Sequence, residues 1–162
     1  MARKQPLKPP ALPEESLDSF HRLLELIHDT VLIHAKGRIV YANSAALGFL
    51  GAGRAEELVG RPVLDIVSPP YRDQVRERIR RTIEEGIQTS PLEMKLLRLD
   101  GMEIDGEAWG VGITFEGAPA TMAVIRDIAE RKRAESVSQN SPRQSLCWLV
   151  YKVQVKQPWP ES

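Results

Sequence analysis

The sequence predicts an α+β domain: a five-stranded antiparallel sheet with helices packed on one face and a flanking helix at the N-terminal side. Two observations lead to this prediction. The spacing of apolar residues changes repeatedly between three or four, which is typical of helices, and two, which is typical of strands. In addition, all 11 glycines lie between Gly37 and Gly117, where they supply turns between short elements.

The first element is a helix, predicted from an apolar stripe with heptad-like spacing. Ser16 is a suitable N-cap for it. The stripe consists of Leu17, Phe20, Leu24, Ile27 and Val31.

A hairpin follows this helix. Residues 30–35 and 38–42 are predicted as two short strands, joined by a tight turn at Lys36 and Gly37.

The next segment is predicted to be helical in short pieces. Asn43 or Ser44 caps a short helix that Gly51 ends. Two single helical turns follow at residues 55–59 and 63–67, and each is ended by glycine or proline.

The longest helix is predicted to begin at Pro70 or Tyr71, because proline is accepted in a first helical turn. One face of this helix is apolar. The remaining faces carry many charges of both signs, which indicates a solvated surface with pairs such as Glu77 with Arg81. Apolar residues recur every four positions, at Tyr71, Val75, Ile79, Ile83 and Ile87.

Three strands complete the predicted sheet. Residues 92–96 alternate, and the change of phase at Leu97 and Leu99 suggests a β-bulge before a turn at residues 100–101. A long strand up to Phe115 and a last strand over residues 120–128 follow, and a helix begins near Glu130.

The composition limits what the chain can do. Its 162 residues are enough for one domain, and 22 basic residues balance 22 acidic ones. Zero net charge argues against a nucleic-acid or anionic-membrane partner. The single cysteine, Cys147, has no second cysteine with which to form an internal disulfide. No apolar segment is expected to be long enough to span a membrane. A cytoplasmic protein is expected.

Three regions differ in composition. Residues 1–15 are rich in proline and read as a flexible arm, and residues 16–135 hold the domain with its flanking helices. Residues 136–162 form an atypical tail, either disordered or a truncated or frame-shifted remnant of an effector region. Residues 146–155 are apolar enough for one edge strand.

Four segments together resemble a PAS domain, the sensory module of bacterial signalling proteins. They are residues 37–46 (GRIVYANSAA), 58–62 (LVGRP), 99–101 (LDG) and 126–132 (RDIAERK). The last is similar to the motif that leads out of the domain into a signalling helix. The resemblance extends over residues 17–135 and implies the PAS fold.

The resemblance assigns signal relay to Asp127, Ile128 and Ala129 at the root of the exit helix. The alternative role for Asp127 is to cap the helix that begins at Glu130. The family usually has threonine where Ala129 stands, so one usual coupling contact is in doubt.

The resemblance also implies a cavity between the sheet and the helices. The long strand has large residues on one face and small ones on the other. If the small face points to the cavity, Trp109 lies on the outer face; in the opposite register it fills the cavity or stacks on a planar ring. Candidate ligand-binding residues are Ile66, Val75, Ile79, Met94, Leu96, Ala108, Gly110 and Met122.

Several cofactors are disfavoured. The long helix lacks the axial histidine of oxygen-sensing haem relatives, and Cys147 lies outside the domain, so neither a flavin–cysteine adduct nor a cysteine-linked chromophore is expected. The apolar candidates favour a small apolar organic ligand over a polyanion. His21, His28 and His34 are too scattered for a metal site and are expected to be packing or half-exposed residues.

No motif joins a nucleophile to a base, and no histidine follows His34 to accept a phosphoryl group, so a non-enzymatic module is expected. The favoured function is a sensor that binds a small molecule or cofactor and relays this through its C-terminal helix, in a histidine-kinase-type pathway. The alternative is an association module without ligand. Both predict a homodimer, with the dimer helix formed by Leu17, Phe20, Leu24 and Ile27.

Overall fold

The computed structural model describes residues 14–139 of the chain. The described residues form two units that meet between Asp127 and Ile128. The first contains every strand, and the second contains the C-terminal helix α4 (Ala129–Gln139). The expected arm up to residue 13 and the tail from residue 140, with its proposed edge strand and Cys147, lie outside the described residues.

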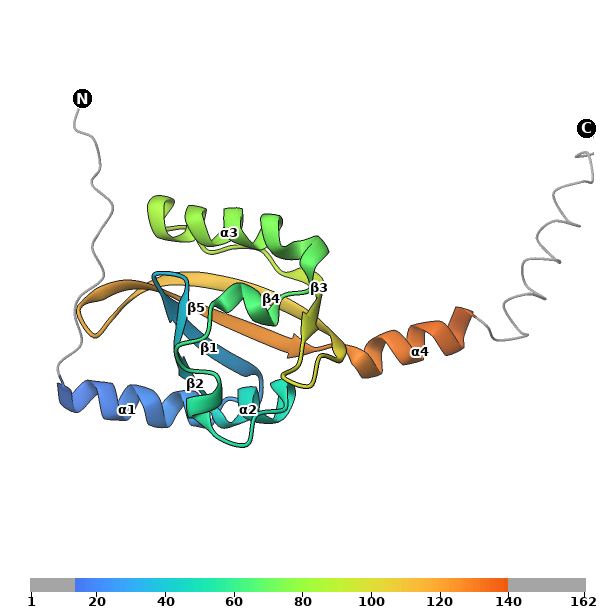
Figure 1. Ribbon diagram of the computed structural model, residues 1–162, viewed down its shortest axis with the longest axis horizontal. Helices are drawn as coiled ribbons and strands as arrows, with labels where there is room; N and C mark the ends of the chain where they lie inside the picture. Colours follow the sequence, from blue (N-terminus) through green and yellow to red (C-terminus); the bar gives the residue numbers. More distant parts are fainter. Residues whose placement is uncertain (1–13, 140–162) are drawn as a thin grey trace, which may run out of the picture. The chain divides into compact units, whose positions relative to one another are not determined.

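The first unit is a five-stranded antiparallel sheet with helices on both sides (Figure 1), as predicted. The strand order is β2-β1-β5-β4-β3. The strands are β1 (Thr30–Ala35), β2 (Arg38–Ala42), β3 (Leu92–Leu97), β4 (Glu103–Phe115) and β5 (Ala118–Asp127). The helices are α1 (Glu14–Glu25), α2 (Ser44–Leu50) and α3 (Arg72–Glu85), with 3-10 turns at Ala55–Glu57, Val63–Ile66 and Pro69–Tyr71.

Local sequence accounts for the two tight turns of the sheet. Lys36 and Gly37 adopt φ of 50° and 77°, and Glu116 and Gly117 adopt 48° and 77°. Two successive residues with positive φ match the right-handed twist of paired strands, so each turn closes a hairpin.

Asn43 ties the start of α2 to the rest of the fold. Its Oδ1 accepts hydrogen bonds of 3.0 Å from the backbone N–H groups of Val31 and Ala46. Its Nδ2 donates to the carbonyl groups of Leu24, Ile27 and Asp29. One buried side chain therefore caps α2 and gives hydrogen bonds to backbone carbonyl groups at the end of α1 and in its connection to β1.

The two faces of the sheet carry separate cores. One face packs against α2, α3 and the 3-10 turns, with Leu32, Leu50, Ile66 and Leu96 among its buried residues. The other face packs against α1, and Figure 1 shows α1 and α3 on opposite sides of the sheet. The buried residues on the α1 side are Leu24, Val31, Ile33, Phe115 and Ala120.

The expected extent of the first helix is wrong at both ends. The helix begins at Glu14, so Ser16 is inside it, and it ends at Glu25, before Ile27. Val31 belongs to β1 and not to the helical stripe. The Asn43 amide accounts for the C-terminal end of α1, because it donates hydrogen bonds to the carbonyl groups of Leu24 and Ile27, where the chain leaves the helix.

The expected bulge at Leu97 and Leu99 is also wrong. The register of β3 with β4 is continuous up to Leu97, where the strand ends. Leu99 N–H then donates to the carbonyl of Leu50, 2.9 Å away, because the chain leaves the sheet to pack against α2. An irregularity occurs instead between β1 and β2, at Ile33 and His34.

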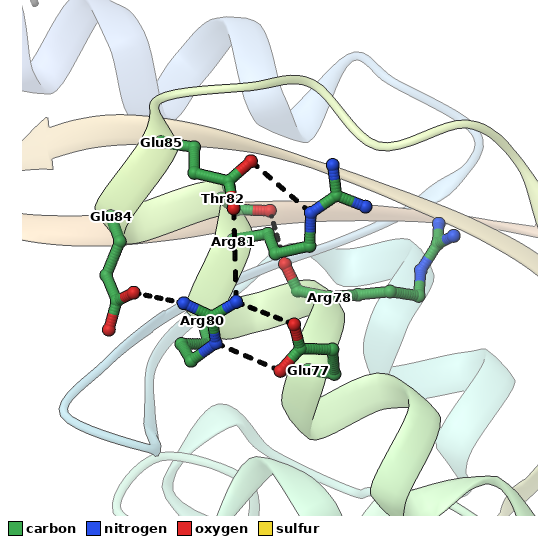
Figure 2. Close-up of polar contacts among 7 residues, drawn as sticks. All are labelled: Glu77, Arg78, Arg80, Arg81, Thr82, Glu84 and Glu85. Carbon is green, nitrogen blue, oxygen red and sulfur yellow. Dashed lines mark hydrogen bonds and ion pairs between the residues drawn. The ribbon is translucent and has the colours of Figure 1, made fainter.

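The charged face of α3 is solvated, but its pairs differ from the expected one (Figure 2). Arg80, not Arg81, binds Glu77, with an N–O distance of 2.6 Å, and it also contacts Glu84. Arg81 pairs with Glu85 at 3.3 Å. All these side chains are exposed, so the pairs add little to stability.

The exit helix is longer than the sequence pattern indicated. Helical spacing was expected to end near residue 135, but α4 continues to Gln139. Ser136 remains compatible with the helix because its Oγ donates to the carbonyl of Lys132, 2.9 Å away.

Candidate functional site

A small cavity lies between α3 and the face of the sheet that α2 and α3 cover. Its volume is about 70 Å³. A water molecule takes up about 30 Å³ in the liquid, and a cavity of about 150 Å³ is known to hold benzene. The cavity therefore has room for a ligand of only a few heavy atoms without rearrangement.

Seven of the eight predicted ligand-binding residues line this cavity, and their role in binding stays a prediction. They come from the 3-10 turn at residues 63–66, from α3 and from β3 and β4. They are Ile66, Val75, Ile79, Met94, Leu96, Ala108 and Gly110.

The eighth predicted residue, Met122, is misplaced by the sequence analysis. It packs in the cluster on the α1 side, opposite the cavity. Its neighbours Thr121 and Ala123 line the cavity instead, because successive residues of a strand point to opposite faces. The error is one residue of register in the last strand.

The glycines of β4 let α3 approach the sheet. A Cβ atom built on Gly112 would lie 2.9 Å from the carbonyl oxygen of Thr82 in α3. The face of β4 with small residues thus points to α3 and the cavity. This is the register that places Trp109 on the outer face of the sheet.

Trp109 belongs to the opposite face, although part of it also borders the cavity. Its strand partner Val124 packs in the α1-side cluster. The guanidinium carbon of Arg126 lies 5.5 Å from the centroid of the tryptophan ring, within cation–π range.

One wall of the cavity carries two buried polar side chains that the sequence analysis did not select, His34 and Thr121. They are paired directly across β1 and β5, and each is 2% exposed. Neither His34 Nδ1 nor Thr121 Oγ1 has a hydrogen-bond partner among the described residues. Burial lowers the pKa of His34 to about 4, so its imidazole is neutral at pH 7.

A detectable signal for His34 existed in the sequence. Alternation along residues 30–35 places it on the same side as Leu32, facing the helices. A lone histidine on an apolar segment is more often a packing residue, and the missing hydrogen-bond partner of His34 is visible only in three dimensions.

Arg78 and Thr89 also line the cavity. The guanidinium of Arg78 donates to the carbonyl groups of Ser90 and Ala108. Figure 2 shows it pointing away from the acidic side chains of α3. Thr89 accepts a 2.8 Å hydrogen bond from Gly110 N–H through its hydroxyl. These contacts attach the segment after α3 to β4.

Three of the four residues predicted as a dimer helix pack inside their own domain. Leu24 is buried, and Leu17 and Phe20 contact the same α1-side cluster. Ile27 follows the helix and is exposed. Exposed apolar residues nearby, Leu23 and Leu26, were not selected, because the heptad spacing favoured the inward stripe.

Glu25 fixes the end of α1. Its carboxylate accepts hydrogen bonds from Tyr41 Oη at 2.8 Å and from Ser44 N–H at 3.0 Å, and it also contacts the Ser44 hydroxyl. The bond from the Ser44 side chain is the main cause that lowers the pKa of this carboxyl.

The predicted relay residues mark the junction of the two units. Asp127 ends β5, Ala129 begins α4, and Ile128 between them is buried. Their role in signalling stays a prediction.

Comparison with known proteins agrees with this architecture. The family model described as the PAS fold matches residues 18–128. The chain belongs to the PAS family. The PAS domain of a protein from Colwellia psychrerythraea has the same fold, with a TM-score of 0.60 at 19% identity, covering 71% of this chain and 98% of that one.

Two longer proteins also contain a PAS segment similar to this chain. Sporulation kinase A from Bacillus subtilis (strain 168) is 31% identical over 135 residues, which are 82% of this chain and 22% of the kinase. An uncharacterized signaling protein from Caulobacter vibrioides is 33% identical over 125 residues, 74% of this chain and 14% of that protein. The PAS chain therefore spans about a fifth or less of the length of these relatives.

PAS domains are in general non-catalytic sensory modules. Within residues 14–139, no helix has the length and apolarity required to cross a membrane.

Proposed function

We propose that this chain is a sensory PAS module that binds a small molecule and transmits its presence to a histidine-kinase-type signalling protein. One observation carries the proposal: the cavity has apolar walls and two unpartnered polar side chains, His34 and Thr121. Such a combination of apolar surface and a few polar groups is typical of small-ligand sites. Similarity to a sporulation kinase supports the signalling context.

The proposed output passes through the end of β5. This strand forms part of the cavity wall at Thr121, Ala123 and Ile125, and it ends at Asp127, where the second unit begins. A ligand that favours one packing of the sheet thereby alters the relay residues Asp127, Ile128 and Ala129. We place this module in the cytoplasm, without nucleic-acid or membrane partners and without catalytic activity of its own.

A second candidate function is protein association without a ligand. Leu23 and Leu26 are 61% and 73% exposed, next to the partly exposed Ile27. Large apolar side chains that remain outside the core are suited to contact with a partner, here a second copy of the chain.

Native mass spectrometry of the full chain purified from cells tests both functions. Sensing predicts a mass above that of the 162-residue chain, lost on mild activation, with a value that identifies the ligand class. A dimer without added mass favours association. To recover a ligand lost in purification, the same measurement is repeated after incubation with a cell extract that contains only small molecules; no added mass in either case contradicts sensing.

A further inference from the structure

The strongest unexplained feature of the cavity is its polar wall. His34 and Thr121 are register partners on β1 and β5. Side chains directly opposite each other in an antiparallel pair lie on the same face, with Cβ atoms about 5 Å apart. The two polar atoms are nevertheless not bonded to each other or to any other described group.

Leaving these atoms without partners is unfavourable. A buried polar group without a hydrogen bond loses its interactions with water and gains nothing in return. Both residues line the cavity, so a group that bridges the two atoms would satisfy them.

The chemistry of the wall restricts this group. Burial keeps His34 neutral, so one of its ring nitrogens accepts a hydrogen bond and the other donates. The Thr121 hydroxyl can do both. A hydroxyl group on the ligand also does both, so it satisfies His34 Nδ1 and Thr121 Oγ1 in either histidine tautomer.

The remaining walls favour a neutral group over an anionic one. Leu32, Val75, Ile79 and Met94 offer only apolar contacts. Arg78 is the charged residue that lines the cavity, and its guanidinium already donates to the carbonyl groups of Ser90 and Ala108. Both bonds use Nη2, so a carboxylate or phosphate would depend on the other Arg78 nitrogens alone and would lose its hydration against the apolar walls, whereas a neutral ligand has far less hydration to lose.

From these contacts we infer that the cavity takes a small neutral molecule with an apolar body and one hydroxyl group, a short-chain alcohol in the simplest case, whose hydroxyl bridges His34 and Thr121. The inference rests on the proposed sensing function and specifies its ligand class. The volume of about 70 Å³ limits the enclosed part to a few heavy atoms.

The test compares an alcohol with an apolar molecule of the same shape. The full ¹⁵N-labelled chain is titrated with 1-butanol and, separately, with n-pentane, and amide shifts of Ala123 and Ile125 on the cavity wall report binding. Titrations are repeated with Thr121→Val, which keeps the shape and removes the hydroxyl, and with His34→Leu. Met122→Leu is the matched control, because Met122 neighbours Thr121 but faces α1.

We expect Thr121→Val to weaken 1-butanol binding about five- to tenfold, which corresponds to one lost hydrogen bond, and to leave n-pentane binding unchanged. His34→Leu has the same selective effect, and Met122→Leu has none. Thr121→Val also unfolds at the same or a higher temperature than the wild type, because it removes an unpartnered hydroxyl. A purely structural role of Thr121 would produce the opposite pattern, a less stable protein with unchanged selectivity.

Two outcomes contradict the inference in different ways. If both probes bind and Thr121→Val affects them equally, the polar bridge is wrong, but the cavity still accepts ligands and the sensing function stands. If neither probe shifts the wall amides, the cavity accepts neither the alcohol nor its apolar analogue. That result overturns the inference and also removes the main support for sensing.

Discussion

At the scale of single residues, Asn43 shows how much one buried amide can organise. It makes five hydrogen bonds to backbone groups of α1, β1, α2 and their connections. The Leu24 carbonyl and the Ala46 N–H also have a backbone partner, but the other three groups rely on this amide near the junction of three elements.

Replacing Asn43 by alanine is expected to lower the free energy of unfolding by about 3 kcal/mol or more. The loss combines a helix cap, worth about 1 kcal/mol, with several backbone groups left unsatisfied. Urea titration followed by circular dichroism measures it. The exposed neighbour Ser44 provides the control, since Ser44→Ala removes a single hydrogen bond, to Glu25, and should change the value by only about 1 kcal/mol. Equal effects of the two substitutions would show that water replaces the Asn43 amide.

His34 makes stability depend on pH. Its folded-state pKa of about 4 lies below the ordinary value of 6.5, so the unfolded chain binds a proton first as the pH falls. The contribution of neutral His34 to the free energy of unfolding is therefore fully present above pH 6.5 and decreases as the pH falls from 6.5 towards 4. Burial is the cause of the lowered pKa.

Between pH 7.5 and pH 5, this histidine should reduce the free energy of unfolding by about 2 kcal/mol. The value is the difference in pH dependence between the wild type and His34→Leu, measured by urea titration at both pH values. Other titrating groups are present in both proteins and cancel. Parallel curves for the two proteins would mean that His34 is protonated without penalty.

At the scale of secondary-structure elements, the approach of α3 to β4 shapes the cavity. The close contact between Gly112 and the Thr82 backbone leaves no space for a side chain. Thr82 itself is buried, and its hydroxyl turns back to the carbonyl of Arg78, 2.8 Å away, so it presents its methyl group to the sheet side.

Gly112→Ala should therefore push α3 away from the sheet and destabilise the fold by about 1–3 kcal/mol, the usual range for overpacking. Thermal unfolding measures the change. Gly48→Ala is a matched control, because Gly48 is exposed in α2 and an added Cβ meets nothing within 4 Å. Alanine is the better helix former, so Gly48→Ala should be neutral or stabilising. A neutral Gly112→Ala would show that α3 moves freely.

At the scale of the whole molecule, the two faces of α1 differ: one contributes to the folded core, and the other is available for association. Its inward face belongs to the core on the α1 side of the sheet, and its outward face carries exposed leucines. Adjacent residues Leu23 and Leu24 represent the two faces, with exposed fractions of 61% and 3%.

Leu24→Ala should lower the free energy of unfolding by about 2–4 kcal/mol, because it leaves a cavity in the core. Leu23→Ala should leave stability nearly unchanged and, if α1 forms a homodimer, weaken that dimer. Urea titration and sedimentation velocity of both variants distinguish the effects. A Leu23→Ala protein with unaltered self-association would contradict a dimer formed through the outward face of α1.

Local patterns predicted most elements of this fold. The bounds of β1 and β2 were predicted to the residue, because alternation, a Lys-Gly turn and an asparagine cap all act within a few residues. The ends of α1 and of α4 were not, since they depend on hydrogen bonds to distant groups or on weak terminal preferences.

By itself, the sequence determined the order of the elements, because hydrophobic periodicity and turn chemistry are local, and its resemblance to PAS motifs gave the PAS fold and seven of the residues that line the cavity. Only the tertiary structure decided that Met122 faces α1 and that His34 meets Thr121 across β1 and β5. Strand register depends on pairing between residues far apart in the chain. Whether a buried polar atom finds a partner is decided by that register, and no spacing within a single strand reveals it.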